Sequence, residues 1–182
     1  MTSRRRGLER IFIFRVCQYE GLDSHLTDEG RKGAKILALH LLNNLGVSRK
    51  SMAMFHSPVL CAKQMAGIMA YPFEVAFEQK ACLFSDSSHP DVDEGILSDC
   101  LELVQEIKSE RVFVRDLIFV THYHQVGELP QYLVRTMFDE PAESRVLDRG
   151  EGWLVNLVRR PRLLQISPQV PARRIRTARV PA

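Results

Sequence analysis

The sequence predicts an α/β domain, a three-layer sandwich in which helices flank a mainly parallel central sheet. Residues 11–14 form a short run of β-branched and aromatic side chains that ends at Arg15, as in a buried strand. A second apolar run, 117–120, ends in polar residues that include His122. Ligands of open α/β sheets bind outside the carboxyl ends of the strands, so Arg15 and His122 are candidate site residues.

The first elements follow from local signals. We expect a strand over 10–15, a loop over 16–26 and a helix whose N-cap is Thr27. The helix should end at Gly46, and acidic residues complement the dipole of its first turn. Its apolar residues recur at helical spacing: Ala34, Leu37, Ala38, Leu41 and Leu42.

Strands and helices continue to alternate through the middle and the end of the chain. A strand over 51–55 leads into a helix with Pro58 at its first position. The later elements are a third strand within 74–84, an amphipathic helix over 91–110, a strand over 117–122, a helix from Tyr123, a final edge strand over 152–158 and a second strand over 162–166.

Composition indicates one soluble domain. The chain has 182 residues, of which 45% are hydrophobic, and no apolar run approaches the ~18 residues of a membrane span. The apolar run after Arg10 is too short for a signal peptide, so a cytoplasmic location is expected. Four cysteines without metal-binding spacing suit a reducing compartment, and Cys82 and Cys100 are predicted to be buried.

Charge divides the chain into three parts: a basic lead at 1–9, a domain at 10–166 and an Arg- and Pro-rich tail at 167–182 that is expected to be disordered. The net charge is +3, and no acidic residue follows Glu151. The tail is interpreted first as a solubilising end. The alternative is an arm that binds an acidic protein or nucleic acid by electrostatics.

Three motifs resemble those of the histidine phosphatase (phosphoglycerate-mutase-like) superfamily. Arg15 after the first strand, followed by Leu-Thr-Asp-Glu-Gly at 26–30, resembles the family's opening. The segment 57–66 resembles its Ser-Pro-Leu-x-Arg-Ala-x-Gln-Thr-Ala motif. His122 and the Val-Gly-x-Leu after it at 126–129 resemble small bacterial phosphohistidine phosphatases in particular.

The resemblance implies a phosphate pocket that is degenerate in this chain. The family reads Arg-His-Gly after its first strand, and the His becomes phosphorylated. Here Val16 takes the position of that His, and Cys17 takes that of the Gly. The second phosphate-binding Arg falls on Cys61. Arg15 and His122 remain as the phosphate-binding residues, and we expect no cofactor and no metal.

The chemistry explains why these losses matter. Val16 has no lone pair with which to attack phosphorus, and Cys61 cannot supply a fixed positive charge. Loss of one such donor costs about 2.7–4 kcal/mol of transition-state stabilisation. We therefore expect no ordinary phosphohistidine route, although Arg15 and His122 could still bind phosphate, sulfate or a phosphorylated ligand.

Several residues are weaker candidates. Cys17 and His122 are the candidate catalytic groups, Cys17 because a thiolate beside an arginine can act as a nucleophile. A buried or idle thiol is the favoured interpretation of Cys17. Candidate auxiliary residues are Ser57, Lys63, His124 and Asp86: Ser57 matches the second motif, and Asp86 could be a proton donor. Lys63 could replace the lost arginine but fits a solvated helix face better, and His124 fits a surface or capping role better.

Three functions are therefore open. The first is a catalytically degenerate relative that serves as a binding or regulatory module. The second is an active phosphatase for phosphohistidine or small phosphomonoesters with a non-standard nucleophile. The third is an interaction scaffold that binds acidic partners or nucleic acid through its basic tail.

Overall fold

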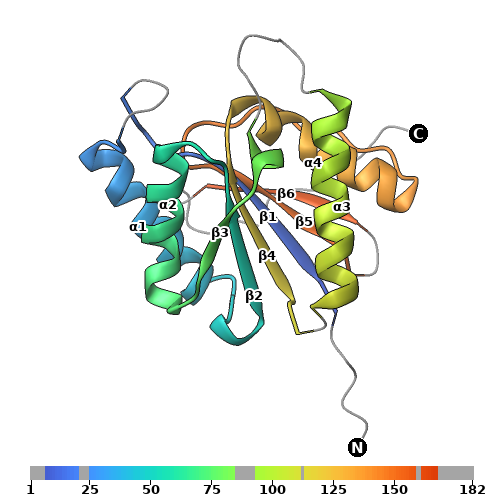
Figure 1. The fold of residues 1–182 in the computed structure, drawn as a ribbon, viewed down its shortest axis with the longest axis horizontal. Coiled ribbons are helices and arrows are strands. Elements are labelled where there is room, and N and C mark those ends of the chain that lie inside the picture. The colour runs from blue at the N-terminus through green and yellow to red at the C-terminus, as the bar shows by residue number, and fades with distance from the viewer. Residues whose placement is uncertain (1–6, 21–24, 85–92, 112, 159–160, 168–182) are drawn as a thin grey trace, which may run out of the picture.

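The computed structural model describes residues 7–20, 25–84, 93–111, 113–158 and 161–167. They form one six-stranded sheet between two layers of helices, with α1 and α2 on one face and α3 and α4 on the other (Figure 1). The expected three-layer α/β sandwich is confirmed. The tail and Asp86 lie outside the described residues.

The strand order is β3-β2-β4-β1-β5-β6. β1 (Arg10–Arg15) and β2 (Met52–His56) pair in parallel with β4 (Asp116–Thr121), which lies between them. β3 (Phe77–Gln79) adds a third parallel pairing beside β2. The sheet is therefore mainly parallel, as the sequence predicts.

The last two strands close the far side of the sheet in antiparallel pairing. β5 (Gly152–Asn156) pairs with β1 on one side and with β6 (Arg162–Ile166) on the other. The prediction of β5 as an edge strand is therefore wrong. β6 covers it because its residues 162–166 pair along the whole length of β5.

In the described part of the chain four α-helices cover the sheet, and their bounds are α1 Asp28–Asn43, α2 Leu60–Ala70, α3 Glu94–Glu110 and α4 Tyr123–Phe138. Short 3-10 turns are η1 Arg49–Ser51, η2 Tyr71–Phe73 and η3 Ala81–Leu83. Alternate residues of β1 face opposite layers: Phe12 and Phe14 pack with α1 and α2, whereas Ile11 and Ile13 pack with α3 and α4. None of the described helices is long and apolar enough to cross a membrane.

Two local predictions need correction. Pro58 is not the first residue of α2, because Ser57 Oγ accepts a hydrogen bond from Val59 N at 3.4 Å, and the helix begins only at Leu60. Cys100 is buried as predicted, but Cys82 is only half-buried because it lines an open cavity beside α3.

A buried carboxylate ties together the amino-terminal ends of the central strands. Asp116 is fully buried, and it accepts hydrogen bonds from Arg10 Nε at 2.6 Å and Arg115 Nη2 at 3.0 Å. Removing one partner of a buried ion pair leaves the other charge uncompensated, which is more damaging than losing an exposed pair.

Asp116→Ala should therefore lower the free energy of unfolding by about 3 kcal/mol in urea denaturation. Glu74→Ala is the matched control, because it breaks the exposed ion pair between Glu74 and Arg49 and should cost no more than about 1 kcal/mol. Equal losses in the two variants would show that Asp116 does not anchor the sheet.

Candidate functional site

Three strands deliver polar side chains to the carboxyl edge of the sheet. Arg15 ends β1, Ser57 directly follows β2 and His122 directly follows β4. Val16 N donates to Thr121 O at 2.9 Å, and Ser57 N donates to Val120 O at 3.0 Å. These bonds hold the ends of β1 and β2 on either side of the end of β4, so the guanidinium and the imidazole share one edge.

The guanidinium of Arg15 is held by groups from two later segments. Its Nη1 donates to Leu147 O at 2.7 Å, and its Cζ lies 4.7 Å from the centre of the Tyr123 ring. The side chain is half-buried. An arginine fixed by a carbonyl and an aromatic face is preorganised and retains donors for an anion.

Sequence reasoning missed Arg149, a second cation beside Arg15. Burial lowers the pKa of Arg15, and the charge of Arg149 lowers that pKa further. Arg149 is held in turn by Tyr19, whose carbonyl accepts from Nη1 at 3.3 Å and whose ring centre lies 4.6 Å from Cζ. Two neighbouring guanidinium groups repel each other, and an anion between them would relieve that repulsion.

His122 is neutral near pH 7. Burial lowers its pKa to about 4, and the charge of Arg15 contributes to this shift. Its Nε2 lies 2.9 Å from Ser57 Oγ, and its ring meets that of Phe84 edge-on at 6.0 Å between centroids. The Ser57 hydroxyl and the Phe84 ring therefore orient the imidazole, which in its neutral form carries one N–H donor.

The two positions that the family resemblance predicts to be degenerate, Val16 and Cys61, lie in the apolar core. Val16 is 1% exposed and Cys61 is 0% exposed, and both belong to the cluster under α1 and α2. Neither side chain can present charge or a nitrogen lone pair to the edge where Arg15 and His122 lie.

Cys17 does not have the environment of a nucleophile. It is 3% exposed, and burial raises the pKa of its thiol to about 12. Gly150, which has a φ of +79°, packs against the sulfur closely enough that a Cβ there would lie 3.1 Å from it. The thiol is therefore protonated and covered at neutral pH, which supports the interpretation of a buried thiol.

The other two described candidates, Lys63 and His124, both lie on helices. Lys63 is exposed on α2, as the solvated-face interpretation predicts. His124 is half-buried in the first turn of α4, with its ring centre 5.1 Å from that of Tyr123, the residue on which Arg15 stacks.

No cluster of three or more His, Cys, Asp or Glu side chains arranged to hold a metal occurs among the described residues.

The motif before α1 has a structural role. Thr27 caps the helix by accepting a hydrogen bond from Gly30 N at 3.1 Å. A Cβ on Gly30 would lie 2.0 Å from Gln18 O, so only glycine lets the loop after β1 pack this closely. The motif therefore holds the segment 16–18 that follows Arg15.

Comparison with solved structures identifies the architecture. The mycobacterial glucosyl-3-phosphoglycerate phosphatase in complex with inorganic phosphate superimposes with a TM-score of 0.66 at 17% identity, over 90% of this chain and 100% of that chain. This chain has the histidine-phosphatase fold. The expected resemblance in fold is thereby confirmed.

Two further structures share the histidine-phosphatase fold. The protein histidine phosphatase SixA, solved with tungstate, gives a TM-score of 0.61 at 19% identity over 87% of this chain and 97% of that chain. The putative alpha-ribazole-5'-P phosphatase from Escherichia coli gives 0.60 at 15% identity over 86% and 95%. No protein-family model and no curated protein matches the sequence.

The depressed pKa of His122 predicts a pH dependence of stability. An unfolded histidine has a pKa of 6.5, whereas folded His122 has a pKa of about 4. Between these values only the unfolded chain takes up the proton, so stability is complete above pH 6.5 and falls as the pH drops toward 4. The loss attributable to His122 should be about 3 kcal/mol.

Imidazole chemical shifts from NMR, assigned with His122→Gln, measure this directly. The His122 signal should remain at its neutral position down to about pH 5, and the variant should lose less stability than the parent between pH 6.5 and 4. A midpoint near the ordinary value of 6.5 would show that the ring is solvated.

Proposed function

We propose that this chain is a catalytically degenerate, phosphohistidine-phosphatase-like member of the histidine phosphatase superfamily. It binds phosphate or a phosphorylated ligand at the edge formed by Arg15 and His122 and acts as a binding or regulatory module. The observation that carries the proposal is the buried Val16, an apolar side chain directly after Arg15, where the family resemblance places the attacking histidine.

The charges of the site support anion binding. Arg15 and Arg149 supply positive charge, and neutral His122 supplies a hydrogen bond donor between the ends of β1 and β2. A guanidinium fork matches phosphate oxygens bidentately. The family resemblance implies a positive charge at position 61 in α2, where this chain has a cysteine. Arg149, in the loop before β5, partly supplies that charge.

Burial argues against the enzyme alternative. The thiol of Cys17 is covered and protonated, and Ser57, although 2.9 Å from His122 Nε2, is 0% exposed. A serine or cysteine that phosphate cannot reach cannot open a covalent route. We assign His122, whose Nε2 lies 2.9 Å from Ser57 Oγ, to hydrogen bonding of the anion and not to attack on phosphorus.

Binding of inorganic phosphate and of tungstate, measured by calorimetry, tests the proposal. Arg15→Ala and His122→Ala should each weaken binding roughly tenfold or more, because each removes a hydrogen bond to a charged ligand. Arg149→Ala should weaken it less, since that side chain is exposed and already paired with Tyr19.

Matched controls are Arg162→Ala and His40→Ala. Arg162 begins β6 at the opposite edge of the sheet, and His40 lies in α1, so neither should change the affinity. Hydrolysis of para-nitrophenyl phosphate should stay at the background rate in the parent. Turnover in the parent that disappears in His122→Ala would show that the protein is a catalyst and overturn the proposal. Equal phosphate affinity in all variants would show that Arg15 and His122 do not bind the anion.

A further inference from the structure

Two cysteines meet on the opposite face of the sheet from Cys17. Cys82 lies in η3 and Cys100 lies in α3. Cys100 Sγ donates to the carbonyl oxygen of Cys82 at 3.1 Å, and the two thiols lie close enough for each to shift the pKa of the other. The Cys100 sulfur therefore lies against Cys82 although 18 positions separate the two residues in the sequence.

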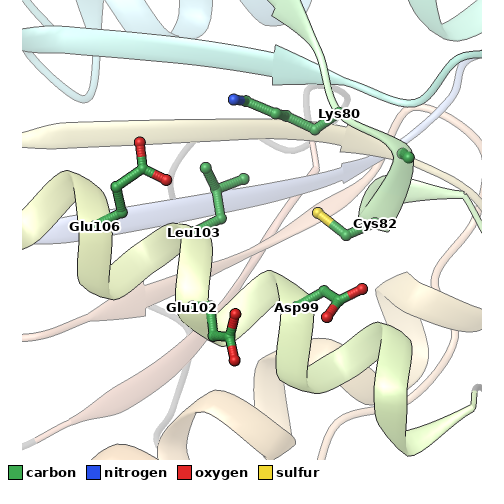
Figure 2. A pocket seen from close by; sticks show the side chains of 7 residues that line it. Lys80, Cys82, Asp99, Glu102, Leu103 and Glu106 are labelled. Atoms are coloured by element: carbon green, nitrogen blue, oxygen red, sulfur yellow. The ribbon is translucent and has the colours of Figure 1, made fainter.

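Only one of the two thiols is open to solvent. Cys82 is half-buried and lines an open cavity of about 440 Å³, whereas Cys100 is 0% exposed behind it. Figure 2 shows the sulfur of Cys82 beside α3, with Lys80 on one side and the carboxylates of Asp99, Glu102 and Glu106 along the helix. A small oxidant can reach Cys82 first, and Cys100 then lies next to the product.

The contact also favours reaction at Cys82. The interaction with Cys100 lowers the pKa of the Cys82 thiol, whereas burial and the nearby charge of Asp99 act in the opposite direction. Thiolates, and not thiols, are the species that peroxide oxidises. The pKa of Cys100 is raised by Cys82 and by burial, so Cys82 is the thiol of the pair that ionises first.

We propose that Cys82 and Cys100 are an oxidisable pair that forms a disulfide when the protein meets a peroxide. The Cys82 thiolate attacks one peroxide oxygen and the O–O bond breaks, which gives a sulfenic acid and, after protonation, water. The Cys100 sulfur then attacks the sulfenic sulfur and displaces its oxygen as a second water. The two thiols together lose two electrons and two protons, which the peroxide takes up.

The pair is connected to the carboxyl edge of the sheet. Cys82 O accepts from Gln125 Nε2, and the next carbonyl, Leu83 O, accepts from Thr121 Oγ1 at 2.7 Å. Phe84 comes next and packs on the His122 ring. A disulfide removes the S–H donor of Cys100 and repositions η3, so oxidation should alter the surroundings of His122.

Mass spectrometry of the full chain after treatment with hydrogen peroxide tests the pair. The expected product is a Cys82–Cys100 linked peptide that has lost two hydrogen atoms and is restored by a reductant. Cys82→Ser should abolish the link. Cys100→Ala should leave a sulfenic acid on Cys82 that dimedone traps. Cys17→Ser, which alters a thiol on the other face of the sheet, should leave the link unchanged.

The imidazole spectrum of His122 provides a readout that does not depend on anion binding. Oxidation should move the His122 signal in the parent and in Cys17→Ser, but not in Cys82→Ser. Thiols at Cys82 and Cys100 that stay reduced, or a Cys82 that overoxidises without forming the link, would overturn the proposal. A linked peptide with no change at His122 would overturn the connection to the edge.

Discussion

The pairing of β4 with β1 on one side and β2 on the other determines where every polar group of the site lies. Each neighbour runs beside β4 in register to its carboxyl end, where Val16 N and Ser57 N donate to successive carbonyls of β4. Parallel strands that end at one level must present their next residues at one edge. A guanidinium and an imidazole that are 107 positions apart in the sequence are therefore neighbours.

Under the proposed function, the same geometry lets the fold keep its shape without a histidine after Arg15. Val16 and Cys61 extend the apolar layer under α1 and α2 to the end of the sheet, so the two replacements add packing where the family resemblance implies charge. The electrostatic part of the site is then carried by Arg15 and Arg149, with a neutral His122 beside them. This distribution of charge is the basis for proposing that the site retains an anion and does not transfer a phosphoryl group.

Much of this edge could be predicted from the sequence because apolar runs ending in Arg15 and His122 mark strand ends. The N-cap at Thr27 could also be predicted, because its hydroxyl accepts a hydrogen bond from an amide only three residues away. Contacts between residues far apart in the sequence could not be predicted. Arg149 lies on a loop and is held by a carbonyl 130 positions earlier, and the contact between Cys82 and Cys100 depends on how η3 packs against α3. The position of Pro58 could not be predicted, because the hydrogen bond from Val59 N to Ser57 Oγ precedes α2 and the helix begins only at Leu60.

A crystal structure of the protein grown with tungstate tests the central claim most directly. The ion should lie between the guanidinium of Arg15 and the ring of His122, held by hydrogen bonds alone, with Val16 still buried beneath it. Tungsten bonded to a nitrogen or sulfur of the protein, or an ion bound away from both residues, would contradict a pocket that holds phosphate without a nucleophile.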